Sequence, residues 1–321
     1  MSMQIAANYA KEFEKIAEAY EKSGGDASNL LDKSISSIII SGDKIIGLNT
    51  VKGVEIESGT REKGVWAKIR ILKGYKIEKP IHLCTGFLGK EGEQRVNFDF
   101  FIEDGAQVDF ISHCSFPWST KLTHKMVANI HIGKNAVMTY NDEHFHSEAG
   151  GITLISDTHA VVEDGGKYEN SFELTKTRVG ILKVRMDVDL KKDAVAKFDS
   201  KIRGKEDDEI SIVESLGLNG EGAHGIAKST VVATDRTRAR IINEAFGNAP
   251  YSKGHIECNE ITKGDKVDVS TLPVLKVTND LSELTHEASI GRVNSNQLNT
   301  LMAKGMSEDE ATEFIIRGIL R

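Results

Sequence analysis

Cys258 and His286 are the pair of side chains best suited to chemistry in this chain. Cys258 ends the strand-like segment 254–258, and His286 follows 28 residues later with Glu287 beside it. A thiolate next to an imidazole suits iron, zinc or copper rather than magnesium or calcium. Because 28 residues is also an interval of the repeat described below, we expect the two side chains to lie level on neighbouring coils, roughly 5 Å apart. The alternative is a buried structural cysteine and a histidine held by a backbone carbonyl.

Two further groups could carry chemistry nearer the middle of the chain. Cys114 leaves a predicted strand just before Pro117, where we expect a reachable thiol, and a protonated His113 would favour its thiolate. His144 and His146 share one face of a predicted strand, and His144 follows Cys114 by 30 residues, so a metal could bind there. For Cys114 the alternative is a structural cysteine. For His144 and His146 the alternative is an exposed, solvated strand face without a metal, and we favour that interpretation.

Composition and missing motifs restrict the class of protein. The net charge is −7, which favours neither nucleic acid nor anionic lipid as a partner. Three widely spaced cysteines indicate reduced thiols in a cytoplasmic protein, and no apolar run approaches the roughly 20 residues of a membrane span. P-loop, G-x-S-x-G, H-E-x-x-H and paired C-x-x-C motifs are all missing from the sequence.

A recurring turn pattern predicts the elements that position these residues. Its copies begin at Ile102, Ile132, Val162, Leu190 and Leu218, at intervals of 30, 30, 28 and 28 residues, and a sixth begins at Ile261 after 43. In four of the six copies the fourth residue is Gly or Asn, which adopt left-handed backbone at low cost. Strand-like alternation follows each turn, so the repeat predicts an all-β solenoid, a parallel β-helix or a related stack.

Helical periodicity replaces the strand pattern at both ends. Near the N-terminus it predicts one amphipathic helix that ends near Gly24, with the apolar stripe Ile5, Tyr9, Phe13, Ile16 and Tyr20. After Gly291 it predicts a helical hairpin, in which Ser307 and Glu310 form a capping box. We therefore expect a helical segment at 1–33, a β-helix at 34–291 and a helical region at 292–321.

Several segments also occur in one characteristic order. They are residues 254–258, 272–277, 284–292, 297–298 and 303–311, and less sharply 112–115 and 132–136. In this order they resemble the SufB/SufD family of iron–sulfur cluster assembly proteins. The resemblance implies a right-handed parallel β-helix with C-terminal helices, which agrees with the independent repeat analysis. It also implies a scaffold, not an enzyme, that holds a transient iron–sulfur cluster.

The resemblance assigns roles to residues and partners. Cys258 matches a cysteine tied to cluster assembly, His286 and Glu287 match the adjoining ligands, and Cys114 resembles a proposed sulfur acceptor. The implied partners are a SufC-like ABC ATPase and either a second copy or a SufD-like paralogue. The ATPase would dock on the C-terminal helices, whose candidate contacts are Leu298, Leu301, Met302, Phe314 and Ile315. The sulfur donor, iron source, cluster type and any role for flavin stay open.

The chain departs from the family pattern in two places. Thr285 stands where SufB has an acidic residue, and most of the N-terminal extension of bacterial SufB is missing. Because it has both Cys258 and the His286–Glu287 pair, the chain resembles a short SufB more than SufD. The alternatives from other classes are a β-helix enzyme acting on acidic polysaccharide and a purely structural interaction module.

Overall fold

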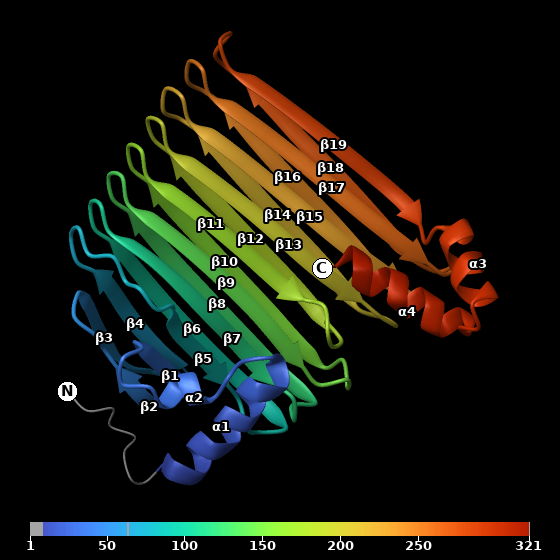
Figure 1. Cartoon of the computed structure of the whole chain (residues 1–321), viewed down its shortest axis with the longest axis horizontal. Helices are drawn as coiled ribbons and strands as arrows, with labels where there is room; N and C mark the ends of the chain where they lie inside the picture. The colour runs from blue at the N-terminus through green and yellow to red at the C-terminus, as the bar shows by residue number, and fades with distance from the viewer. Residues whose placement is uncertain (1–8, 63, 321) are drawn as a thin grey trace.

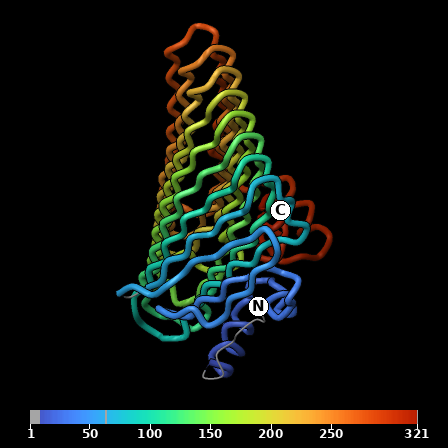
Figure 2. The backbone as a smooth tube through the Cα atoms, turned by 90° about the vertical axis from the view of Figure 1, so that its left-hand side faces the viewer, coloured from blue at the N-terminus to red at the C-terminus, as the bar shows by residue number. Residues whose placement is uncertain are grey.

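The computed structural model describes residues 9–62 and 64–320 and has the architecture of a parallel β-solenoid (Figures 1 and 2). Each coil adds one strand to each of two sheets, so consecutive strands of one sheet are separated in sequence by a strand of the other. Within the described residues the sheets have ten and nine strands. The prediction of an all-β solenoid with an N-terminal helix and C-terminal helices is confirmed.

The two sheets are named here by their strands. Sheet A contains β1 (Ser37–Ser41), β2 (Lys44–Asn49), β5 (Ile81–Gly86), β7 (Gln107–Phe116), β9 (Val137–His146), β11 (Lys167–Leu174), β13 (Val195–Gly204), β15 (His224–Thr234), β17 (Lys253–Lys263) and β19 (Glu283–Arg292). Sheet B contains β3 (Val54–Arg61), β4 (Gly64–Ile71), β6 (Glu91–Ile102), β8 (Lys121–Ile132), β10 (Ile152–Val162), β12 (Ile181–Leu190), β14 (Glu209–Leu218), β16 (Arg238–Gly247) and β18 (Asp268–Val277).

Side chains alternate between the interior of the solenoid and its outer surface, as the period of a strand requires. The interior is filled by apolar residues from both sheets, including a cluster in which Phe100 lies edge-on to Phe110 at 5.1 Å and to Tyr140 at 5.8 Å. Burial of these rings stabilises the folded chain by about 25 cal/mol for each Å² of apolar surface removed from water. Every coil therefore depends on its two neighbours for a continuous core.

The recurring turn forms one corner of the coil. Gly105, Asn135, Gly165 and Asp193 have positive φ angles of 68°, 54°, 67° and 53°, at the fourth position of the first four copies. The N–H of each donates to a carbonyl in the next turn, as from Asn135 to Asp164 at 3.0 Å. These hydrogen bonds stack the corners, which confirms the reason for the preference for Gly and Asn.

The last two copies of the pattern were assigned wrongly. In the fifth, the left-handed residue is Gly222 (φ 70°) rather than Glu221, because the turn contains one extra residue. The sixth corner is at Tyr251 (φ 59°), whereas Gly264 belongs to a second column of left-handed residues that includes Asp235. Since both columns use the same backbone conformation, the sequence alone did not separate them. The repeat is therefore regular where the sequence predicted a 43-residue interruption.

The N-terminal end of the solenoid is capped. β1 and β2 pair antiparallel, as do β3 and β4, so these hairpins end the parallel stacking, with β2 and β3 as the edge strands of the two sheets. Helix α1 (Ala10–Ser23) covers the outer face of β5, β7 and β9 through Phe13, Ile16 and Tyr20, and it ends at Gly24 (φ 110°) as predicted (Figure 1). Ile5 of the predicted stripe lies outside the described residues. A short helix, α2 (Ser28–Leu31), follows.

The C-terminal helices lie beside the last coils (Figure 1). α3 (Ser295–Ala303) and α4 (Glu308–Ile319) form the predicted hairpin, with Gly305 (φ 99°) between them and the capping box of Ser307 and Glu310 in place. Ile316 of α4 packs on Val232 of the solenoid. None of the helices in the described part of the chain is both long and apolar enough to cross a membrane.

Candidate functional site

Cys258 and His286 lie on adjoining strands but not at the same level. Cys258 of β17 is in register with Ala288 of β19, while His286 is in register with Ile256. The expectation that the two would be level is wrong, because β17 and β19 are offset by 30 residues and not by 28. Both positions face the interior side of sheet A, so the two side chains are diagonal neighbours. Cys258 is buried, whereas His286 is exposed.

Glu287 lies on the opposite face of the same strand. It is in register with Glu257, whose carboxylate pairs with Lys228 at 2.9 Å on the outer surface of the solenoid. Adjacent residues of a strand point to opposite faces, so a single chain does not bring Glu287 to Cys258. The three residues assigned from sequence therefore do not converge within one protomer.

A buried polar network surrounds Cys258. Burial raises the pKa of its thiol, although hydrogen bonds with Thr271 and Ser229 lower it in part. In the same interior, the carboxyl of Glu214 on β14 accepts hydrogen bonds from Ser200 at 2.5 Å and from Asn243 at 3.1 Å. Burial raises the pKa of Glu214 to about 7.

Sequence reasoning missed this network, although a signal was present. Glu214 is the third inward-facing residue of β14, between Ile212 and Leu216, where the alternation predicts an apolar side chain. Glu260 likewise occupies an inward position two residues after Cys258, and burial raises its pKa to about 7. In both strands a glutamate occupies an inward position where the alternation predicts an apolar residue, and this departure would have identified both carboxyls from the sequence.

Cys114 is enclosed in the interior, not exposed at a turn. β7 continues to Phe116, and Cys114 is 1% exposed, so the expected reachable thiol is wrong. Burial raises the pKa of this thiol well above its usual value. His113 faces outward beneath α1, where it hydrogen-bonds with Ser23 at 2.7 Å, and burial lowers its pKa to about 4. A neutral His113 on the other face of the strand does not activate Cys114.

His144 and His146 are also buried, which contradicts their assignment to an exposed face. His144 is in register with Cys114, as its 30-residue spacing predicted. Asp142 joins this pair: its carboxylate lies 3.1 Å from Nε2 of His144, and one ligand atom of each of the three residues falls within 4.8 Å of the others. The Nδ1 atom of His146 instead faces the carbonyl of Val179 at 3.2 Å.

A family model covers the region that holds all these residues. The model described as "SUF system FeS cluster assembly, SufBD core domain" matches residues 96–319, more than two thirds of the chain. The chain belongs to the SufBD family.

This SufBD chain is similar along its length to archaeal relatives. It is 46% identical over 319 residues to an iron–sulfur cluster assembly SufBD family protein of Pyrococcus horikoshii, which covers 99% of this chain and 97% of the relative. A SufBD family protein of Methanocaldococcus jannaschii is 36% identical over 310 residues, covering 97% and 98% of the two chains. SufB of Bacillus subtilis is 23% identical over 270 residues, which is 78% of this chain and 54% of the relative.

The C-terminal end of the SufBD solenoid has no cap among the described residues. β18 and β19 are the last strands of their sheets, and no further strand covers them. Leu272 and Ile290 on these strands are 50% and 51% exposed, and Val277 at the end of β18 and Leu281 in the following turn are also exposed. Large apolar side chains gathered at one open end mark a surface suited to protein association.

The predicted ATPase contacts surround a groove between α3 and α4. Leu301, Phe314 and Ile315 line this groove, which has a volume of about 570 Å³, and Phe314 is 60% exposed. Leu298 is half-buried on α3, and Met302 is exposed. α4 is held on the solenoid by an ion pair between Glu313 and Arg203. An apolar helical groove of this kind can accept a partner protein.

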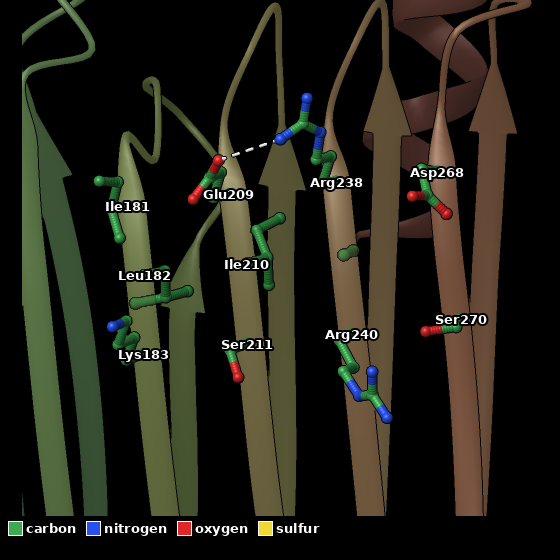
Figure 3. Close-up of a pocket in the computed structure, with 11 residues that line it drawn as sticks. Ile181, Leu182, Lys183, Glu209, Ile210, Ser211, Arg238, Arg240, Asp268 and Ser270 are labelled. Carbon is green, nitrogen blue, oxygen red and sulfur yellow. Dashed lines mark hydrogen bonds and ion pairs between the residues drawn. The ribbon is translucent and has the colours of Figure 1, made fainter.

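The outer face of sheet B contains a shallow hollow between β12, β14, β16 and β18 (Figure 3). Glu209 contacts Arg238 at 3.5 Å, and Asp268 is in register with Arg238 on its other side. The arginine lies between the two carboxylates, as in a ladder of surface ion pairs. A glycosidase requires two carboxyl groups that flank a scissile bond, so this hollow gives the polysaccharide-enzyme alternative no support.

Proposed function

We propose that this SufBD chain is a scaffold component of the SUF machinery and assembles a transient iron–sulfur cluster where the open ends of two chains meet. The observation that carries the proposal is the difference between the two ends of the solenoid. The N-terminal end is formed by two antiparallel hairpins, and none of the described large apolar side chains that are exposed lies on their strands, whereas the end next to Cys258 and His286 exposes Leu272 and Ile290. A terminal coil needs a cap, and a second copy of the chain provides one.

The number of ligands also favours two chains. Iron–sulfur clusters normally have four protein ligands, most of them thiolates. One chain offers Cys258 and His286 on the same side of sheet A, and Glu287 on the other side. Two open ends facing each other double this set, either in a homodimer or with a SufD-like paralogue. Such a set has two thiolates where most clusters have four, so the cluster would be held weakly enough to be passed on.

Cys258 must become more accessible before it binds iron. It is buried one strand behind β19, next to Thr271 of β18. A displacement of β19 relative to β17 would uncover the thiol, and loss of burial would lower its pKa towards the ordinary value. Metal binding would then replace the remaining proton.

A SufC-like ABC ATPase is the proposed source of this movement. It would dock in the groove between α3 and α4, where Phe314 is exposed, Leu301 is half-buried and the buried Ile315 lines the wall. α3 follows β19 after two residues, and α4 contacts β13 through Arg203 and β17 through Lys263. Motion of the helical hairpin would therefore reach the strands that carry the proposed ligands. The assignment of Cys114 as sulfur acceptor stays a prediction, and it requires the interior to open.

The decisive experiment is anaerobic co-expression of the chain with its cognate ATPase. We expect the purified complex to show the absorption and Mössbauer spectra of an iron–sulfur cluster. Cys258→Ala should abolish these signals while circular dichroism stays unchanged. Cys84→Ala is the matched control, because Cys84 is equally buried but lies under α1 at the capped end.

A folded Cys258→Ala complex that retains the cluster would overturn the role of Cys258. If neither the natural chain nor any variant carries a cluster, the structural-module alternative holds instead.

A further inference from the structure

We infer that this chain binds one divalent transition-metal ion, zinc or iron(II), inside the solenoid at Cys114, Asp142 and His144. This internal site is separate from the open end, where the transient cluster is proposed. Three ligand-bearing side chains come together on two neighbouring strands, β7 and β9, and their ligand atoms lie within 4.8 Å of one another. All three are buried, at 1%, 4% and 1% exposed.

No lysine or arginine in residues 9–62 and 64–320 forms an ion pair with the buried carboxylate of Asp142. Within the described residues its ion partner is His144, and Oδ1 makes no hydrogen bond. An ionised carboxylate in an apolar interior is costly unless it is paired or coordinates a metal. A divalent cation between Asp142, His144 and Cys114 would supply the missing positive charge.

A fourth residue supports the same interpretation from the other sheet. His124 of β8 is completely buried, and in the described structure neither of its ring nitrogens has a hydrogen-bond partner. Burial lowers its pKa to about 3, and the nearby His144, His146 and Asp142 also act on it. Buried polar atoms without partners are rare and call for an explanation such as an unseen ion. His124 therefore lies near the site as a candidate fourth ligand, outside the group of three whose ligand atoms lie within 4.8 Å of one another.

The mixture of donors defines the class of ion. One thiolate, one carboxylate and one or two imidazoles suit zinc and iron(II), whereas calcium and magnesium prefer oxygen ligands. Binding would displace the proton of the Cys114 thiol, since metal ligands of this type must be deprotonated. The enclosed position implies that the ion enters as the chain folds.

The metal content of the purified full chain tests this inference. The chain is produced without its ATPase in medium containing zinc and iron, purified without a metal-affinity column, and analysed by inductively coupled plasma mass spectrometry. We expect about one zinc or iron per chain in the natural sequence, and a near-complete loss in Cys114→Ser and in Asp142→Asn. Growth in cobalt medium should give a thiolate-to-cobalt charge-transfer band that Cys114→Ser abolishes.

Two control variants separate this site from other thiols. Cys84→Ser and Cys258→Ser should each retain the metal and the cobalt band. A natural chain without bound metal in both media, metal retained in folded Cys114→Ser, or metal lost in Cys258→Ser would overturn the inference. If Cys114→Ser does not fold, Asp142→Asn decides, because it removes the carboxylate charge but leaves the thiol and the side-chain volume. The result is independent of cluster assembly, which requires the ATPase complex.

Discussion

Glu214 is a buried carboxyl that makes the stability of the chain depend on pH. Its pKa in the folded chain is about 7, against 4.5 for the free side chain, because burial disfavours the charged form. Folded chains therefore keep a proton that unfolded chains lose above pH 4.5. The corresponding stabilisation is complete below pH 4.5 and is lost as the pH rises through 7, by on the order of 3 kcal/mol.

Glu214→Gln should remove this part of the pH dependence. The amide keeps the shape of the side chain, and Asn243 has a carbonyl oxygen free to accept its N–H. We expect the free energy of unfolding, measured by denaturant titration, to fall less between pH 5 and pH 8 in the variant than in the natural chain. If the free energy of unfolding changes equally with pH in the two proteins, Glu214 does not have the raised pKa. Glu260, whose pKa burial also raises to about 7, should contribute a pH dependence of its own that is the same in both proteins.

The site residues show which facts the sequence supplied. Spacing alone paired Cys114 with His144, because the coils there are exactly as long as the repeat predicted. Spacing failed for Cys258 and His286, because the 28-residue offset of the middle coils does not hold for β17 and β19, which are offset by 30 residues. Burial of Cys114 was missed because Pro117 suggested an earlier end of β7. Convergence of side chains from two sheets, as with His124, depends on the closed coil and has no linear signal.

At the level of elements, the corners between strands limit which substitutions the solenoid accepts. Gly105 and Gly180 both have positive φ, of 68° and 72°. A Cβ at Gly105 would have no neighbour closer than 3.9 Å, whereas one at Gly180 would lie 2.3 Å from the carbonyl oxygen of Ile152. Alanine at Gly105 therefore meets only the cost of left-handed backbone, about 1–2 kcal/mol. At Gly180 it must also displace a strand.

We accordingly predict that Gly180→Ala lowers the free energy of unfolding clearly more than Gly105→Ala does. Thermal and denaturant unfolding of the two variants would measure the difference. Equal losses would mean that β10 shifts at little cost, which the tight pairing of β10 with β8 and β12 argues against.

For the whole molecule, the proposed dimer would form through the open end of the solenoid. Ile290 lies on the interior-facing side of β19 and is 51% exposed, so the proposed dimer would bury it. Ile290→Lys should convert dimers to monomers in sedimentation velocity experiments, because a lysine ammonium in an apolar contact is strongly unfavourable.

Ile226→Lys is the matched control for this experiment. Ile226 is 44% exposed on the outer face of β15, away from the open end, and its replacement should leave the dimer intact. Dissociation by both variants, or by neither, would argue against association through β18 and β19.

The antiparallel hairpins at the start of the solenoid also set an upper limit on growth. An exposed strand edge is a template on which further chains can add, and a molecule with two such edges would form filaments. Here the hairpins β1–β2 and β3–β4 reverse the strand direction on one side, so the parallel stack stops there and the edge strands β2 and β3 are antiparallel to their neighbours. A head-to-head pair would therefore form one parallel stack through two molecules, with an antiparallel edge strand of each sheet at both extremities.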